Sequence, residues 1–394
     1  MRLLHVSIWA ATDPLIRNSV LPKLQILRSE FSITDQHLCL FNRWQPYQGQ
    51  LNDLLDGLQI HVLESSPFPL RWFDLTFRII QWQKKFHKLL QDIRPNRVIM
   101  HGTPTGVLAF QACVQLGIPF QVESCEPHAQ YMADSGAWKL WGVKYWYARY
   151  QEKRLYACAT YLLPVSSHYA AQLSKQGISP DKIITLPCCI PTSLFQFDAE
   201  NRRISREKFS IPQDAVVGVY LGKFNGVYFP VSVLKTLTAA FTFFPNYYHL
   251  FLTAEPRDLL VDTLKGFGIP LDRVVIYQSP SHEVPVHLAA ADFAWSFIKP
   301  SVSSRFCSPV KNAEYLASGL PVILPGGIGQ DSDLITNERA GAIDDFSTRQ
   351  LQQETLSTIQ SIMTTPGVRA RLGALASCYR GEHLIKEAYR FVFK

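Results

Sequence analysis

Short apolar runs alternate with stretches of helical periodicity along most of the chain, and this alternation most constrains the fold. In the first half, strands are expected at residues 3–9, 38–40, 60–63, 97–100, 119–123, 161–165 and 182–186. Helices are expected between them, including a long amphipathic helix over 71–93 that ends at Arg94 and Pro95. Strands that alternate with helices through short turns predict a parallel sheet covered on both faces. The chain is therefore expected to be an α/β protein.

A second series of the same kind follows in the other half of the chain. Strands are expected there at residues 216–221, 250–253, 274–277 and 292–296, again separated by helical stretches. A chain of 394 residues is long enough for two domains, each with its own buried core. Hydrophobic residues make up 47% and charged residues 18% of the sequence, which is typical of globular proteins.

Composition and charge exclude several classes of protein. No apolar run is long enough to cross a bilayer, and the first residues begin a strand instead of a signal peptide, so a cytoplasmic or membrane-surface location is expected. The eight cysteines include no C-x-x-C pair, and the adjacent Cys188 and Cys189 favour reduced structural thiols. The net charge of +7 favours anionic partners such as nucleotide diphosphates or acidic lipids. No nucleic-acid-binding module is recognisable.

The stretch from 303 to 335 has the most informative local pattern. Ser308 and Pro309 are typical of a helix start, with a hydroxyl able to cap and proline at the first helical position. Apolar residues at helical spacing follow, with Lys311 and Glu314 near the first turn, and Gly319 ends the helix before the buried strand at 321–324. The N-terminus of such a helix favours phosphate. A capped connection between helix and strand without any ligand fits the pattern equally well.

These residues also resemble a known motif. The pattern S-P-x-K-x-x-E-Y-L-A-x-G-L-P-V-I is similar to the nucleotide-sugar donor motif of the family 4 glycosyltransferases. The resemblance implies two Rossmann-like domains that face each other across a cleft, the GT-B fold. It also implies that Glu314 holds the ribose of the donor nucleotide. Many members carry a second glutamate eight positions earlier, where this chain has Phe306.

The same resemblance assigns the donor phosphates and the domain limits. Lys223 follows Gly222 at a strand end, where members place a basic residue that contacts the donor phosphates. A second family lysine has no match at 227–229, and Lys311 is the candidate to replace it, beside Ser308 as a further donor-binding residue. The segment 188–198 resembles the interdomain linker. The first domain is then expected at 1–197, completed by 375–394 after the last helix crosses back, and the donor domain at 198–374.

Titratable residues follow two strands of the first domain. His101 comes before Gly102 at a strand end, and either a place in the crevice or a capping or packing role would explain it. Glu126 and His128 follow the next strand, where a carboxylate and an imidazole could orient hydroxyls or move a proton. Family members often have a histidine at the place of His128, near the donor sugar and the acceptor. Glu123 is expected to end its strand or to make a structural ion pair.

Asp331, Ser332 and Asp333 resemble the metal-binding acidic pair of another glycosyltransferase fold. Their place before a helical pattern favours a helix N-cap instead, and no other cluster has metal-ligand spacing. We therefore expect no metal and no cofactor besides the nucleotide-sugar co-substrate.

Two segments of the first half combine basic and aromatic residues, 71–94 and 138–154. Such helices could dock on acidic lipid, or they could bury their aromatic rings on the sheet and expose a solvated basic face. The sequence leaves both interpretations open.

Together the residues and the resemblance imply a glycosyltransferase of the hexosyltransferase type. It would move a sugar from a nucleotide-diphosphate sugar to a glycan or lipid-linked acceptor, with retention, in bacterial surface polysaccharide synthesis. In that mechanism Lys223 and Lys311 stabilise the departing diphosphate, and His128 contacts the donor sugar or acceptor. Were the reaction inverting, Glu126 or His128 would be the base. The alternatives are a nucleotide-sugar epimerase of the same fold and a non-catalytic binding subunit.

Overall fold

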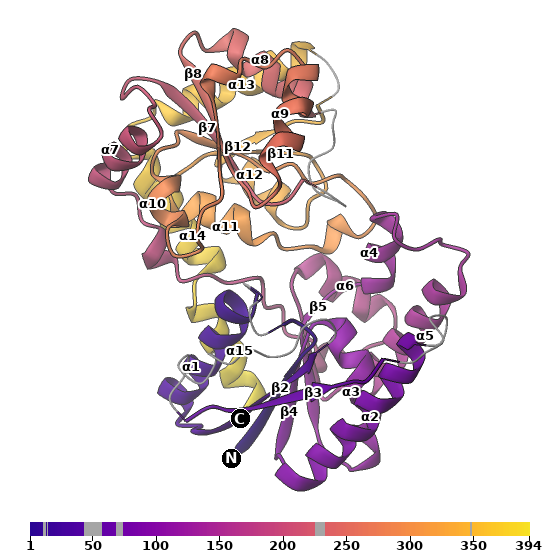
Figure 1. Ribbon diagram of the computed structural model, residues 1–394. Helices are drawn as coiled ribbons and strands as arrows, with labels where there is room; N and C mark the ends of the chain where they lie inside the picture. The colour runs from indigo at the N-terminus through magenta and orange to yellow at the C-terminus, as the bar shows by residue number, and fades with distance from the viewer. Residues whose placement is uncertain (11–12, 14, 43–56, 68–73, 225–232, 347–348) are drawn as a thin grey trace. The chain divides into compact units, whose positions relative to one another are not determined.

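The chain divides into two compact units in a computed structural model (Figure 1). Unit 1 comprises Met1–Cys188 with His383–Lys394, and unit 2 comprises Cys189–Glu382. The structure describes residues 1–10, 13, 15–42, 57–67, 74–224, 233–346 and 349–394. The start of the helix expected at 71, part of the first loop and the segment 227–229 lie outside the described residues.

Unit 1 is built on a parallel sheet of six strands in the order β3-β2-β1-β4-β5-β6. The strands are β1 (Arg2–Ser7), β2 (Asp35–Asn42), β3 (Gln59–Glu64), β4 (Arg97–His101), β5 (Phe120–Cys125) and β6 (Tyr161–Pro164). The first strand lies at the centre because the chain builds the sheet outward to one edge and then returns to build the other. This is the strand order of the Rossmann fold.

Helices cover both faces of this sheet. They are α1 (Leu21–Phe31), α2 (Asp74–Ile93), α3 (Thr103–Gln115), α4 (His128–Asp134), α5 (Val143–Cys158), α6 (Ser167–Lys175) and α15 (His383–Val392), with short turns η1 (Ile16–Val20) and η2 (Pro180–Lys182). Figure 1 shows α1 beside α15, and α2 beside α3. The strand expected at 182–186 was wrong. That segment lies along β6 but makes a single bridge, between Leu162 and Ile183, so it does not extend the sheet as a named strand.

Unit 2 repeats this arrangement with the strand order β12-β11-β10-β7-β8-β9. Its strands are β7 (Val216–Leu221), β8 (Tyr247–Leu252), β9 (Val274–Tyr277), β10 (Phe293–Trp295), β11 (Val322–Leu324) and β12 (Gly341–Ile343). All of its strand pairs are parallel. Read from its other edge, this order is β9-β8-β7-β10-β11-β12. If the strands of each unit are numbered from its first strand, both sheets then have the order 3-2-1-4-5-6. The expected α/β class with two Rossmann-like domains is therefore confirmed.

Two apolar cores fill the two faces of the second sheet, because successive strand side chains point to opposite sides. Val217 and Val219 of β7 face one core, and Tyr220 of the same strand faces the other. The helices are α7 (Ala199–Lys208), α8 (Val233–Phe243), α9 (Arg257–Gly266), α10 (Val284–Leu288), α11 (Val310–Ala317), α12 (Asp331–Asn337), α13 (Arg349–Met363) and α14 (Val368–Arg380), with turns η3 (Thr192–Phe195), η4 (Leu271–Arg273) and η5 (Ser304–Phe306). Burial on both faces explains why these strands are continuous apolar runs.

The units divide at Cys188 and again before His383, whereas the sequence placed the corresponding limits at 197 and 375. Helix α15 belongs to unit 1 although it ends the chain. Lys386 pairs with Glu30 of α1 at 2.7 Å, and the Arg97 guanidinium donates to the carbonyl of Val392 at 2.6 Å. Among the described residues, no helix combines the length and apolar character that a membrane crossing requires.

Both sheets have a topological switch point where the strand order reverses. It lies between β1 and β4 in unit 1 and between β7 and β10 in unit 2. In open α/β sheets ligands bind outside the carboxyl ends of the strands at this point. Ligand-binding side chains are therefore expected at these two places.

Candidate functional site

In unit 2, α11 is tied to the carboxyl end of β7. The buried hydroxyl of Tyr315 accepts a hydrogen bond from the backbone N–H of Leu221 at 2.6 Å. This contact fixes the first turns of α11 beside the loop that leaves β7. It brings Glu314, one residue before Tyr315, to the switch point.

Gly222 is the residue that allows the loop and the helix to come this close. Its φ of +133° is rarely adopted by residues with a side chain, and a Cβ there would lie 2.8 Å from Nζ of Lys311. The Lys311 ammonium lies over the ring of Tyr220, 4.8 Å from its centroid. The Tyr220 hydroxyl donates to the carbonyl of Lys223 at 2.5 Å, which holds the loop while the Lys223 side chain is exposed. The structure thus gathers Lys223, Lys311 and Glu314 at one place.

Burial shifts the pKa values of Lys311 and Glu314 in α11 in the directions that favour their uncharged forms. Removal from water lowers the pKa of Lys311 to about 7, against the opposing effect of Glu314. Removal from water likewise raises the pKa of Glu314 to about 7, against the opposing effect of Lys311. Within the part of the chain that the structure describes, the Glu314 carboxylate makes no hydrogen bond. A carboxylate and an amine with shifted pKa values at a switch point are typical of a functional site.

Ser308 does not cap α11, so that expectation was wrong. The N-cap is Pro309, without a side-chain cap, because the hydroxyl of Ser308 is taken by the guanidinium of Arg380. Arg380 also donates to Asp331, whose other oxygen accepts from the amide of Asn312 at 2.7 Å. These buried groups connect α11, α12 and α14. Donor binding by Ser308 stays a prediction.

The acidic triplet begins α12 as expected but does not cap it. Asp331 is the first residue of the helix and Gln330 is its N-cap, without a side-chain cap. The Asp331 carboxylate pairs with Arg380 instead. No group of three His, Cys, Asp or Glu side chains in the described part of the chain could hold a metal ion.

In unit 1, Glu126 and His128 lie together after β5. His128 is the first residue of α4, and its Nδ1 lies 3.8 Å from Oε1 of Glu126. The imidazole packs edge-on against Trp138, with 6.0 Å between ring centroids. The side chains of His128 and Glu126 both remain partly exposed. An accessible imidazole beside a carboxylate is able to orient a hydroxyl or transfer a proton.

Sequence reasoning missed a third group beside them, Glu152 of α5. Its buried Oε1 accepts from the backbone N–H of Ala129 at 2.7 Å, so it holds the first turn of α4. Burial raises the pKa of Glu152 to about 7, although that N–H and His128 act in the opposite direction. Its place inside an aromatic, basic helix gave no signal, because a glutamate there is expected to face solvent.

His101 belongs to a buried network and is not open to a ligand. It is 1% exposed, and its Nε2 lies 3.1 Å from Nδ1 of His5. Its Nδ1 lies 3.8 Å from Glu123, which forms an ion pair of 2.9 Å with Lys23. Burial lowers the pKa of His5 to about 4 and that of His101 well below its usual value. The packing interpretation of His101 and the structural ion pair expected for Glu123 both agree with this geometry.

Comparison with known proteins gives one family match and several similar structures. Residues 38–189, most of unit 1, match the family model described as a glycosyl transferase 4-like domain. No curated protein matches the chain.

Among solved structures, HepE from Anabaena in complex with UDP-glucose is 12% identical, with a TM-score of 0.72 over 100% of this chain and 99% of its own. Sucrose-phosphate synthase from Thermosynechococcus elongatus is 15% identical, with a TM-score of 0.73 over 100% and 99%. The UDP-GlcNAc 2-epimerase from Neisseria meningitidis bound to UDP-GlcNAc is 13% identical, with a TM-score of 0.65 over 100% of both chains. At these identities the likeness concerns the fold.

Proposed function

We propose that this protein is a glycosyltransferase that moves a sugar from a nucleotide-diphosphate sugar to a glycan or lipid-linked acceptor, with retention at the anomeric carbon. The observation that carries the proposal is the gathering of Lys223, Lys311 and Glu314 at the switch point of unit 2. The family match in unit 1 and the likeness to structures with bound UDP-sugars support the same function.

Each residue of this group has a chemical role in the proposal. Glu314 accepts hydrogen bonds from the ribose hydroxyls, since its carboxylate has no hydrogen-bond partner among the described residues and interacts only electrostatically with Lys311. Lys223 and Lys311 stabilise the charge that develops on the diphosphate as the bond from the anomeric carbon to the phosphate oxygen breaks. Burial makes the Lys311 ammonium costly, and the arriving diphosphate would favour its charged form.

The acceptor hydroxyl forms the new bond to the anomeric carbon and gives its proton to the departing diphosphate. No protein base is required for that step. His128, beside Glu126 in unit 1, is proposed to contact the donor sugar or the acceptor. If the reaction inverts the anomeric centre, Glu126 or His128 takes the proton instead.

Glu314→Gln tests the donor site. We expect the variant to fold and to bind UDP, GDP or the corresponding sugar nucleotides about tenfold more weakly, because a neutral amide replaces a charged acceptor. Titration calorimetry with a panel of nucleotides measures the change. Glu338→Gln is the matched control. Glu338 precedes β12, so it lies at the amino ends of the strands, whereas the candidate donor site lies at their carboxyl ends. Equal affinity of Glu314→Gln and wild type would show that Glu314 has another role.

The epimerase alternative is favoured by the likeness to the Neisseria enzyme. It requires conversion of UDP-GlcNAc with no acceptor present, which chromatography of the sugar nucleotide detects. The binding-subunit alternative is favoured by Phe306, which replaces a glutamate of the motif. In that case the same calorimetry would find no nucleotide affinity in the wild-type protein.

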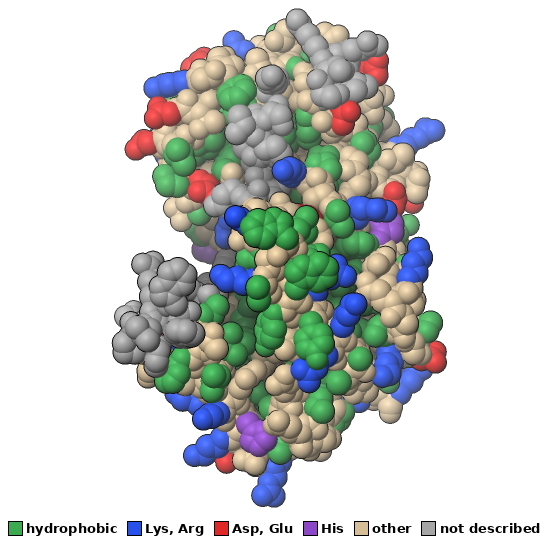
Figure 2. Space-filling model, turned by 90° about the vertical axis from the view of Figure 1, so that its right-hand side faces the viewer, with side chains coloured by type: hydrophobic (Ala, Val, Ile, Leu, Met, Phe, Trp, Pro, Cys, Tyr) green, Lys and Arg blue, Asp and Glu red, His purple; other side chains and the backbone are tan. Residues whose placement is uncertain are grey.

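The surface of unit 1 supports a lipid-linked acceptor. Six large apolar side chains between 140 and 150 are 54% to 86% exposed: Leu140, Trp141, Val143, Trp146, Tyr147 and Tyr150. Lys139, Lys144 and Lys153 are exposed among them, and Figure 2 shows hydrophobic and basic side chains intermingled on this face. Helix α3 contacts both α5 and α2, and α2 carries further exposed apolar side chains, Leu75, Phe77 and Ile80. Apolar rings with interspersed lysines favour an anionic membrane surface.

Sedimentation with lipid vesicles tests this surface. We expect binding that needs acidic lipid and weakens with salt, because each lysine near the surface contributes about 1 kcal/mol. Replacing Trp141 and Trp146 by serine should return the protein to the supernatant. Leu259→Ser is the control, since Leu259 is 66% exposed but lies on α9 of unit 2. Equal recovery in the supernatant with neutral and acidic vesicles at low salt would favour a soluble acceptor.

A further inference from the structure

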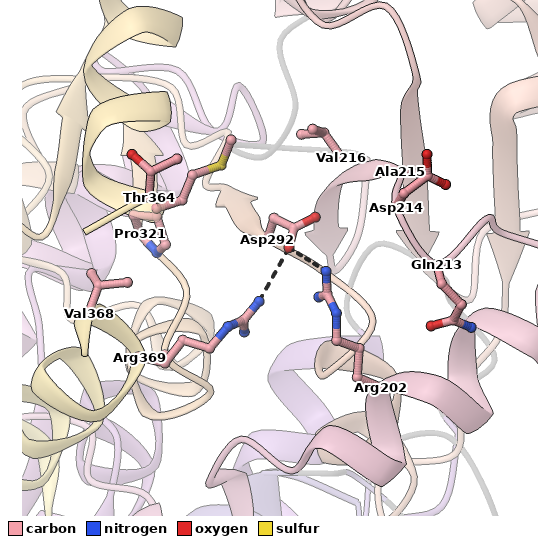
Figure 3. Close-up of a pocket in the computed structure, with 12 residues that line it drawn as sticks. Arg202, Gln213, Asp214, Ala215, Val216, Asp292, Pro321, Thr364, Val368 and Arg369 are labelled. Atoms are coloured by element: carbon pink, nitrogen blue, oxygen red, sulfur yellow. Dashed lines mark hydrogen bonds and ion pairs between the residues drawn. The ribbon is translucent and has the colours of Figure 1, made fainter. Parts of the chain in front are cut away.

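The amino-terminal edge of the unit 2 sheet, opposite to the donor site, contains a pocket of about 380 Å³ (Figure 3). One wall carries Thr364, Val368 and Arg369, and the other carries Gln213, Asp214 and Val216. Arg202 of α7 and Arg369 of α14 both point to Asp292 at its centre. None of these residues takes part in the proposed transfer.

Three arginines converge on the single carboxylate of Asp292. Oδ1 accepts from Arg202 at 2.7 Å and from Arg369 at 3.4 Å, and Oδ2 accepts from Arg206 at 2.9 Å. The backbone N–H of Val217 also donates to Oδ2 at 2.9 Å, so the carboxylate has no capacity left for a second short bond to Arg369. Three guanidinium groups thus share one carboxylate, which leaves an excess of two positive charges around Asp292.

A structural role accounts for two of the arginines but only in part for the third. Arg202 and Arg206 donate to the carbonyls of residues 289–291 that follow α10, and to those of the turn before β7. Arg369 has one short bond, of 2.7 Å, to the carbonyl of Ala291. Its Nη1 is buried and has no hydrogen-bond partner among the described residues. A buried guanidinium N–H without an acceptor is unfavourable unless a ligand or water supplies one.

The remainder of the pocket favours the same kind of ligand. Arg369 is the second residue of α14, where the first-turn N–H groups and the helix dipole attract anions. Asp214 is the other acidic residue of the lining, and its side chain is exposed on the far wall, where water screens it. Burial lowers the pKa of Arg369 to about 10, and the neighbouring charges of Arg202 and Arg206 act in the same direction, against the opposing effect of Asp292.

We propose that this pocket binds a phosphate group, free or as part of a small phosphorylated molecule. Phosphate carries close to two negative charges at neutral pH, which matches the charge that Asp292 leaves uncompensated. Guanidinium groups bind it through paired N–H donors. The site is separate from Lys223, Lys311 and Glu314, because it lies at the amino ends of β7 and β10 and they lie at the carboxyl ends.

Titration calorimetry of the full chain with inorganic phosphate, at constant ionic strength in chloride buffer, tests the proposal. Wild type should show saturable binding at one site. Arg369→Gln should bind at least about tenfold more weakly, because it loses a charged donor. Thr364→Asp should lose binding as well, since it places a carboxylate on the pocket wall without changing the arginines, and it serves if Arg369→Gln does not fold.

Two controls locate the site. Arg371→Gln alters an exposed arginine of the same helix that donates to the carbonyls of Glu338 and Arg339, and it should bind phosphate like wild type. Lys223→Ala should also keep phosphate binding, although it changes the proposed donor site. Absence of saturable binding in wild type would overturn the proposal. So would unchanged affinity in both Arg369→Gln and Thr364→Asp, or loss of binding in Lys223→Ala alone. Tighter binding of glucose 6-phosphate than of phosphate would identify the ligand as an ester.

Discussion

Lys23→Met should lower the free energy of unfolding by about 3 to 5 kcal/mol, the cost of breaking a buried ion pair by removing one partner. Lys23 is 6% exposed, and its ammonium is 2.9 Å from the fully buried Glu123. Burial raises the pKa of Glu123, but Lys23 and His101 outweigh that effect and lower it to about 2. Without Lys23 the carboxylate must stay charged without its cation or take up a proton. Urea unfolding at pH 7 measures the loss.

The pH dependence and a control distinguish this explanation from general damage. Because the pKa of Glu123 is depressed, its contribution in wild type is complete above the ordinary value near 4.5 and is lost only as the pH falls toward 2. In Lys23→Met protonation of Glu123 becomes easier below pH 7, so the difference from wild type should shrink toward pH 5. Lys386→Met, which breaks the exposed pair with Glu30, should change little. A deficit that does not vary with pH would contradict the explanation.

Lys223→Ala should lower turnover at saturating donor by about 10- to 1000-fold, the scale of losing one preorganised group that stabilises charge in the transition state. The side chain leaves the loop after β7, and the hydrogen bond from Tyr220 to the backbone of Lys223 should keep that loop in place in the variant. Release of nucleotide diphosphate from the sugar nucleotide is the measurement.

The control for this variant is Lys265→Ala, which removes an exposed lysine at the end of α9 in the same unit. It should leave turnover unchanged. If Lys223→Ala turns over at the wild-type rate while Lys311→Met does not, the diphosphate is stabilised from α11 alone and the role given to Lys223 is wrong.

The sequence predicted those parts of the fold that depend on local pattern. Buried parallel strands are continuous apolar runs, so β1, β4, β7 and β8 could be identified within a few residues. The segment at 182–186 has the same pattern but pairs with a neighbour at one bridge only, which no local feature encodes. Similarly, the hydroxyl of Ser308 caps no helix because Arg380, far along the chain, takes it.

Long-range pairing also hid the groups around the candidate sites. Lys23 lies on a helix where a lysine is expected to face solvent, and its partner Glu123 is a hundred residues away. The aromatic residues of α5 deviated in the other direction. The sequence favoured rings that cover the sheet over rings that face outward, yet Trp146 and Tyr147 are 60% exposed, while only Tyr145 and Tyr156 among these are buried. Helical spacing alone could not select the face, because the rings spread over more than half of the circumference of this helix.

The position of α15 has a consequence for how the protein forms during synthesis. Unit 2 is one continuous segment, so all of its strands are available once the ribosome has passed Glu382. Unit 1 begins the chain, yet the side of α1 that α15 covers stays uncovered until the residues after His383 have emerged. Domains generally fold in the order of their synthesis. Here the part made first is the part completed last, and the nascent chain must hold an unfinished apolar surface through the synthesis of all of unit 2.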